Sequence, residues 1–161
     1  MTPERRRSVR DRVLLDVNAL AIYLVEDHPG FPYISVHIEP GFTGERQLLV
    51  FDYLPLRAYW VLTSMWGISE EEARRAVISF LEQPILLVGA TKETVRRAYE
   101  IAREKHHDVF DCFYISLARD NNATHLLTTD TDFERLCLGE DFEYLNPVPS
   151  NLLSSFGVGR G

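Results

Sequence analysis

Apolar and polar positions divide most of the chain into short apolar runs separated by stretches of helical periodicity. The runs are continuous in leucine, isoleucine and valine, which is typical of strands that are buried on both faces. Strands are predicted at residues 12–16, 47–51, 84–89, within 124–133 and at 142–146. Helices are predicted between them at residues 18–26, 33–38, 54–66, 69–83, 91–105, 108–122 and 132–138. The alternation predicts a parallel sheet with helices on both faces, which is a three-layer α/β/α domain.

Several of these helices begin or end at residues that suit helix termini. Ser69 precedes a run of glutamates, and Asp108 precedes an apolar segment, so both are expected to be N-caps. Gly67 is expected to end the helix that begins at residue 54.

Length and composition favour one globular domain over residues 1–161, because 45% of the 161 residues are hydrophobic. Residues 1–11 are rich in arginine and are expected to form a flexible basic arm. Residues 147–161 are rich in proline and glycine and are expected to form a loose tail.

The net charge of -7 argues against a protein that coats nucleic acid by charge alone. The arginines of the first dozen residues allow a local contact with phosphate or with an acidic partner, and a solvated terminus is the other explanation. No apolar run reaches the roughly 18 to 20 residues of a membrane helix, and the first residues lack the apolar stretch of a signal peptide. A cytoplasmic protein without a membrane partner is therefore expected. Cys112 and Cys137 lack CxxC spacing, which supports neither a zinc site nor a disulfide framework.

Carboxylates follow two of the predicted strands. Asp16 ends the first strand, and Asp130 and Asp132 follow the fourth. Ligands of parallel α/β sheets bind beyond the carboxyl ends of the strands, so these side chains are expected to face one cleft. A right-handed crossover can bring Asp111, in the first turn of its helix, to the same edge. Each acid also has a structural explanation, such as Asp16 capping the helix that follows it.

Carboxylates that converge without a basic partner repel one another, and a divalent cation would offset the repulsion. Oxygen ligands of this kind suit Mg²⁺ or Mn²⁺, with Asn18 and the hydroxyl of Thr128 or Thr129 as further donors. A site of this kind can activate water against a phosphodiester.

Two segments in this order resemble the PIN domain family, and within it the VapC-type toxin ribonucleases and their archaeal relatives. They are VLLDVNAL at residues 13–20 and DCFYISLARDNNATHLLTTDTDF at residues 111–133. The resemblance implies five parallel strands in the order 3-2-1-4-5 and a metal-dependent endonuclease that acts on RNA. By resemblance, the first, third and fourth acids of the family are Asp16, Asp111 and Asp130. Asn18, Thr128 and Asp132 match positions that support the metal site, and Asp132 is expected among the metal ligands.

The chain departs from the family pattern at the second acid, where Arg57 stands in place of the usual glutamate. Three explanations remain open. Asp52, just past the second strand, could replace the missing carboxylate. Arg57 could bind the scissile phosphate. Arg57 could also form an ion pair that holds the site together without chemistry.

The sequence therefore predicts an Mg²⁺- or Mn²⁺-dependent endoribonuclease that hydrolyses RNA. The resemblance further implies a homodimer and a toxin held inactive by a small antitoxin protein. A catalytically silent PIN fold that binds RNA or protein is the alternative, because Arg57 replaces an acid. A phosphatase-like or receiver-like domain, phosphorylated on the aspartate at the end of a strand, is a third interpretation.

Overall fold

The sheet of the protein contains five parallel strands, as predicted. The computed structural model describes residues 10–156. The strands are β1 (Arg12–Leu15), β2 (Gln47–Phe51), β3 (Leu86–Val88), β4 (His125–Leu127) and β5 (Glu143–Leu145). They are hydrogen-bonded in the order β3-β2-β1-β4-β5, and every neighbouring pair is parallel. The fold class and the strand order expected from the sequence are confirmed.

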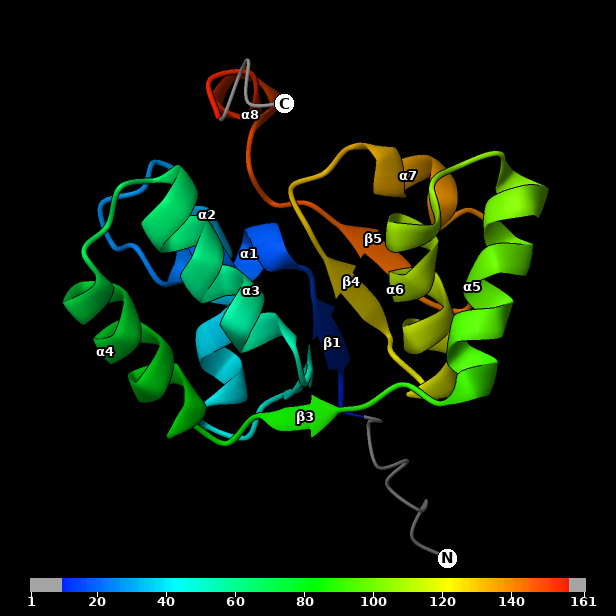
Figure 1. Cartoon of the computed structure of the whole chain (residues 1–161), viewed down its shortest axis with the longest axis horizontal. Helices are drawn as coiled ribbons and strands as arrows, with labels where there is room; N and C mark the ends of the chain where they lie inside the picture. The colour runs from blue at the N-terminus through cyan, green and yellow to red at the C-terminus, as the bar shows by residue number, and fades with distance from the viewer. Residues whose placement is uncertain (1–9, 157–161) are drawn as a thin grey trace, which may run out of the picture.

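Helices cover both faces of this sheet. They are α1 (Val17–Tyr23), α2 (Phe31–Ile38), α3 (Leu54–Trp60), α4 (Glu70–Leu81), α5 (Lys92–Lys105), α6 (Val109–Asp120), α7 (Asp132–Leu136) and α8 (Ser150–Leu153), with a 3-10 turn at Glu39–Gly41. Figure 1 shows α1 to α4 on one side of the sheet and α5 to α7 on the other. None of the described helices has both the length and the apolar character needed to cross a bilayer.

The core lies in two layers because successive side chains of a strand point to opposite faces. Val13 and Leu15 of β1 pack with α1, α2 and α3, whereas Leu14 packs with α5, α6 and α7. Both layers contain side chains that are fully buried. This double-sided burial explains why the strands read as continuous apolar runs.

The expected caps are present. The Ser69 hydroxyl accepts a hydrogen bond from the backbone N–H of Glu72 at 3.2 Å, and the Asp108 carboxylate accepts one from that of Asp111 at 3.0 Å. Each bond satisfies an amide that has no partner within its helix.

The helix predicted over residues 54–66 changes its hydrogen-bond pattern at Val61. Val61–Met65 is π-helical, and the backbone N–H of Trp66 donates to the carbonyl of Val61 at 3.1 Å. The Trp66 ring lies against the His28 ring, with 5.1 Å between ring centroids and an interplanar angle of 30°. Gly67 then ends the segment with φ of 69°, as predicted.

The C-terminal segment differs from the loose tail expected over residues 147–161. Val148 is buried, and Leu152, Leu153 and Phe156 pack against the core layer that contains α1 and α2. The Phe156 ring meets the His28 ring edge-on at 4.7 Å. The expectation of a loose tail is wrong for 147–156, because these apolar side chains anchor a proline-rich segment; 157–161 lie outside the described residues.

Most of the basic arm predicted over residues 1–11 also lies outside the described residues. Arg10 donates to the carbonyl of Gly44 at 3.3 Å. Arg12 belongs to β1 and donates from Nε to the carbonyl of Asn121 at 3.0 Å. Arg12 therefore has a structural role at the amino end of the sheet.

Candidate metal centre

The structure brings Asp16, Asp111 and Asp130 together at the carboxyl edge of the sheet. Leu15 of β1 lies opposite Leu127 of β4, so the residues that follow these strands are neighbours. The charges of Asp130 and Asp111 both raise the pKa of Asp16. Among the described residues, the set of three potential metal-ligand side chains whose ligand atoms lie within 4.8 Å of one another is His107, Asp111 and Asp132.

Asp16 is the most deeply buried of the acids, with 4% of its surface exposed. Its Oδ1 accepts a hydrogen bond from the backbone N–H of Ala19 at 2.8 Å, so it caps α1. Its Oδ2 accepts one from the Thr128 hydroxyl. Burial raises the pKa of Asp16 to about 7, although both hydrogen bonds act in the opposite direction. Asp16 is therefore a helix cap and a member of the acidic site.

Thr128 joins Asp16 to the loop that follows β4. Its Oγ1 also accepts a hydrogen bond from the backbone N–H of Asp130 at 2.9 Å. The Asp130 carboxylate in turn accepts one from the backbone N–H of Asp132 at 2.9 Å. The pKa of Asp130 is raised, first by burial and then by the nearby charge of Asp132. These bonds fix the loop that carries two of the acids.

Asp111 is held by a residue that the sequence did not assign to the site. His107 Nε2 lies 2.7 Å from Asp111 Oδ2, and Arg135 Nη2 lies 3.1 Å from His107 Nδ1. A guanidinium only donates, so Nδ1 accepts and Nε2 carries the proton that it donates to Asp111. Arg135 also donates to the carbonyl of Lys105 at 2.7 Å. The chain of bonds ties α7 to α6 and so fixes Asp111 relative to the loop of Asp130.

Asp132 is exposed and lies near the same histidine. One potential ligand atom from each of His107, Asp111 and Asp132 falls within 4.8 Å of the others. Burial raises the pKa of Asp111, and the hydrogen bond from His107 opposes that rise. Asp132 thus borders the acidic site on its solvent side.

Within residues 10–156, the acids form no hydrogen bond or ion pair with Asn18, Asp52 or Arg57. Asn18 is exposed and lines a cavity of about 310 Å³ that Thr129 also borders. Asp52 is exposed, and its backbone N–H donates to the carbonyl of Val88 at 3.0 Å. Its carboxylate lies on the β3 side, because an ideal Cβ at Gly89, the residue after β3, would be 3.4 Å from Asp52 Oδ2. Arg57 is exposed on α3, with its guanidinium 4.5 Å from the centre of the Trp60 ring.

The residues present suit a divalent cation. Within residues 10–156, no lysine or arginine forms an ion pair with the site acids, which are Asp16, Asp111, Asp130 and Asp132. The pKa values of Asp16, Asp111 and Asp130 are all raised. No lysine or arginine within residues 10–156 offsets their negative charge, and oxygen donors that carry negative charge are the setting that Mg²⁺ and Mn²⁺ require.

A model of the PIN domain matches residues 46–138, which is more than half of the chain. The chain belongs to the PIN domain family. The matched part of this PIN domain includes Asp111 and Asp130, while Asp16 precedes it. No curated protein matches the chain.

Solved structures of similar fold include a VapC and a VapBC protein. Mycobacterium tuberculosis VapC20, a Sarcin-Ricin loop cleaving toxin, is 12% identical, with a TM-score of 0.59 over 76% of this chain and 92% of that one. Rickettsia felis VapBC2, bound to a DNA fragment from its promoter, is 14% identical, with a TM-score of 0.63 over 84% and 98%. PAE2754 from Pyrobaculum aerophilum is 14% identical, with a TM-score of 0.53 over 93% and 98%. At these identities the likeness shows a shared fold.

Proposed function

We propose that this PIN domain is an endoribonuclease that hydrolyses RNA phosphodiester bonds with the help of Mg²⁺ or Mn²⁺. The observation that supports this most strongly is the acidic site at the carboxyl edge of the sheet, which no lysine or arginine within residues 10–156 neutralises. A structural ion pair would bring a lysine or arginine to the acids, and residues 10–156 provide none; the basic side chain in contact with them is His107, which donates to Asp111. Membership of the PIN family supports the same chemistry.

In this proposal Asp16, Asp111 and Asp130 hold the cation, and Asp132 contributes from the solvent side. A bound divalent cation supplies charge neutralisation at the scissile phosphate and lowers the pKa of water. The Thr128 hydroxyl keeps one oxygen of Asp16 occupied and so orients the carboxylate. Asn18, exposed at the start of α1, is proposed to orient water or substrate.

Arg57 is proposed to bind a phosphate of the RNA. It lines the same cavity as Asp111, is exposed, and forms no ion pair with a carboxylate within residues 10–156. This disfavours a purely structural ion pair. The position of Asp52 on the β3 side also disfavours its replacing the missing second acid. A guanidinium suits phosphate oxygens because it offers paired donors.

We further propose that the protein acts in the cytoplasm as the toxin of a toxin–antitoxin pair, as a homodimer bound by a small antitoxin. The supporting observation is the shared fold with VapC20 and with VapBC2. The alternative of a catalytically silent module that binds RNA or protein is favoured by one observation, the replacement of the usual second acid by Arg57.

Cleavage of labelled single-stranded RNA in Mn²⁺, in Mg²⁺ and in EDTA tests the proposal. Asp111→Asn removes the charge of one ligand while keeping the shape of the side chain, and Asp52→Asn is the matched control outside the acidic site. We expect metal-dependent cleavage by the wild type and by Asp52→Asn, and at least roughly a hundredfold less by Asp111→Asn. Equal cleavage by all three proteins would indicate a contaminating nuclease, and no cleavage by any would favour the silent module.

A further inference from the structure

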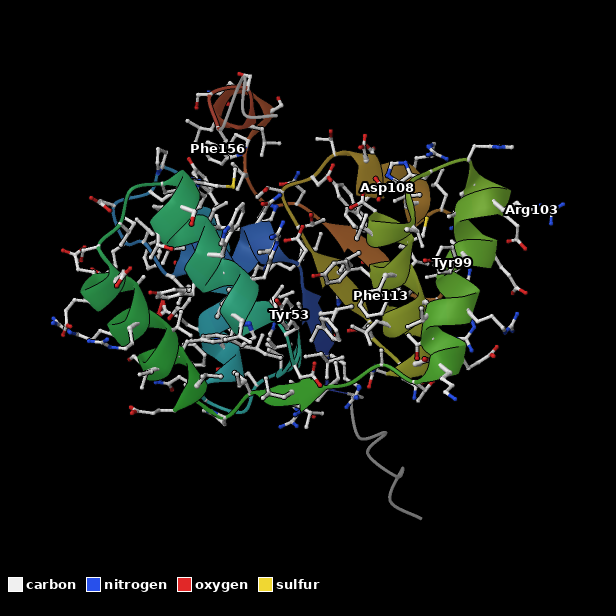
Figure 2. The ribbon with its side chains drawn as sticks, viewed as in Figure 1. Tyr53, Tyr99, Arg103, Asp108, Phe113 and Phe156 are labelled. Carbon is white, nitrogen blue, oxygen red and sulfur yellow. The ribbon has the colours of Figure 1, made fainter. Side chains whose placement is uncertain are left out.

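After β5 the chain turns onto the side of the sheet that α1 to α4 cover. Val148 is buried there, with 4% of its surface exposed, and it fixes the chain before α8 begins. We call residues 149–156 the C-terminal strap. Figure 2 shows Phe156, its last residue, between α8 and the helices on this side of the sheet.

Apolar and ring contacts alone join the C-terminal strap to the rest of the described chain. Its hydrogen bonds, such as that from the backbone N–H of Phe156 to the carbonyl of Leu153 at 3.1 Å, have both partners inside residues 149–156. The strap contains no charged residue, so it forms no ion pair. A four-residue helix such as α8 is not stable by itself in water. The position of the strap therefore depends on the packing of Leu152, Leu153 and Phe156.

The Phe156 ring fills a notch above Gly30. A Cβ atom at Gly30 would lie 3.0 and 3.1 Å from two carbons of that ring, so a side chain there would push the ring outwards. The backbone of Gly30 has φ of -82°, which any residue adopts, so glycine is needed here for space and not for conformation. The contact of Phe156 with Gly30 and with the His28 ring therefore holds the end of the strap in place.

The C-terminal strap also covers a hollow beside the acidic site. Leu153 and Phe156 line a cavity of about 310 Å³ together with Asn18 and Thr129. Thr129 directly precedes Asp130 in the loop after β4. The strap therefore forms one wall of the space next to the acid-bearing loop, and its removal would widen that space.

We propose that the C-terminal strap opens as a unit while the domain stays folded, and that opening widens access to the acidic site from the α1 side. The statement about access rests on the proposed function, whereas the opening does not. Opening exposes Leu152, Leu153 and Phe156 but breaks no hydrogen bond to the rest of the described chain. Local opening of this kind requires less free energy than global unfolding, which also separates the strands.

Thiol labelling in EDTA measures the opening without RNA. Leu153→Cys places a thiol where the strap packs on the core, and Ser154→Cys places one at the next, exposed position. The labelling rate at Ser154→Cys is the reference for an accessible thiol. Cys112 and Cys137 are buried in the core layer on the other face of the sheet, so their labelling in the same samples reports global unfolding. Mass spectrometry of peptides separates the three positions.

We expect labelling at Leu153→Cys to be at least roughly fivefold slower than at Ser154→Cys, and at least roughly a hundredfold faster than at Cys112 or Cys137. Low concentrations of urea should accelerate labelling of the two native cysteines and leave Leu153→Cys nearly unchanged, because local opening exposes little surface. The same urea dependence at Leu153→Cys and Cys137 would mean that the strap opens only when the domain unfolds. Equal rates at Leu153→Cys and Ser154→Cys would mean that no closed strap exists. Either result would overturn the inference.

Gly30→Ala tests the closing contact without changing the strap. The added methyl group meets the Phe156 ring, so labelling at Leu153→Cys should become roughly five- to tenfold faster. Gly89→Ala is the matched control, because a Cβ there makes only an ordinary contact at 3.4 Å and lies beyond β3. In a Phe156→Ala background, Gly30→Ala should add little, since the ring that it meets is absent. Equal labelling of the Gly30→Ala and Gly89→Ala proteins would overturn the closing contact.

Access to the acidic site is tested separately. If the closed strap restricts access, Gly30→Ala should cleave labelled RNA roughly two- to fivefold faster than wild type at limiting substrate, because more of the protein is open. Gly89→Ala should match the wild type. Faster labelling without faster cleavage by Gly30→Ala would overturn the statement about access and leave the nuclease standing. No cleavage by any protein would overturn the proposed function, while the labelling rates would still decide whether the strap opens.

Discussion

Replacing Asp16 by asparagine is expected to stabilise the metal-free protein at alkaline pH. The carboxyl group of Asp16 has a pKa near 3.8 in the unfolded chain, and burial raises this pKa to about 7 in the folded state. Between these values the folded protein binds more protons than the unfolded chain. The contribution of Asp16 to the free energy of unfolding therefore falls as the pH rises from 3.8 to about 7, and it stays low at higher pH.

The size of the effect follows from the same shift. Each pKa unit is worth about 1.4 kcal/mol, so ionising Asp16 costs the fold on the order of 3 kcal/mol between pH 4.5 and pH 8. Asparagine carries no charge and retains an oxygen for the N–H of Ala19. The free energy of unfolding of Asp16→Asn, relative to wild type, should therefore increase by about that amount between the two pH values.

Urea denaturation in EDTA at pH 4.5 and pH 8 measures this difference, and comparing two pH values cancels effects of the substitution that do not depend on charge. Asp141→Asn is the control, because Asp141 is exposed. Mn²⁺ at 100 times its Kd should then stabilise the wild type by about 2.7 kcal/mol and Asp16→Asn much less. A relative stability that is the same at both pH values would refute the reasoning.

Three further outcomes are expected. His107→Ala should weaken Mn²⁺ binding in calorimetry roughly tenfold, and His107→Gln should restore part of it, because glutamine can still donate to Asp111; equal affinity of all three proteins would contradict this positioning role. Arg57→Glu restores a carboxylate at the second acidic position, so it should raise Mn²⁺ affinity while lowering RNA affinity in EDTA, and a rise in RNA affinity would exclude a phosphate contact. Phe156→Ala should lower the free energy of unfolding by roughly 1 to 3 kcal/mol in urea denaturation, because the ring packs on His28, and no change would contradict the packed C-terminal segment.

The fold could be predicted from the sequence because both faces of the sheet are covered. Full burial leaves each strand as a continuous apolar run, and the caps Ser69 and Asp108 mark helix starts locally. The strand order came from a resemblance, since no local pattern specifies which strands are neighbours. The π-helical turn at Val61 was missed because it depends on tertiary packing around Trp66.

The site was predicted only in part. The convergence of Asp16, Asp111 and Asp130 follows from their places at strand and helix ends. The hydrogen bonds from Arg135 through His107 to Asp111 join α7 to α6. The contact of Arg135 with His107 depends on the tertiary fold, so the sequence does not predict it. The four-residue separation of His107 and Asp111 is the one signal in the sequence.

Calorimetric titration of Mn²⁺ into EDTA-treated, dialysed protein tests the proposed metal centre most directly, because the proposed function requires the three carboxylates to hold a divalent cation. We predict a saturable heat for the wild type and for Asp52→Asn, and at least about tenfold weaker binding by Asp111→Asn. No binding by the wild type, or equal binding by Asp111→Asn, would contradict the claim that these acids form a metal centre.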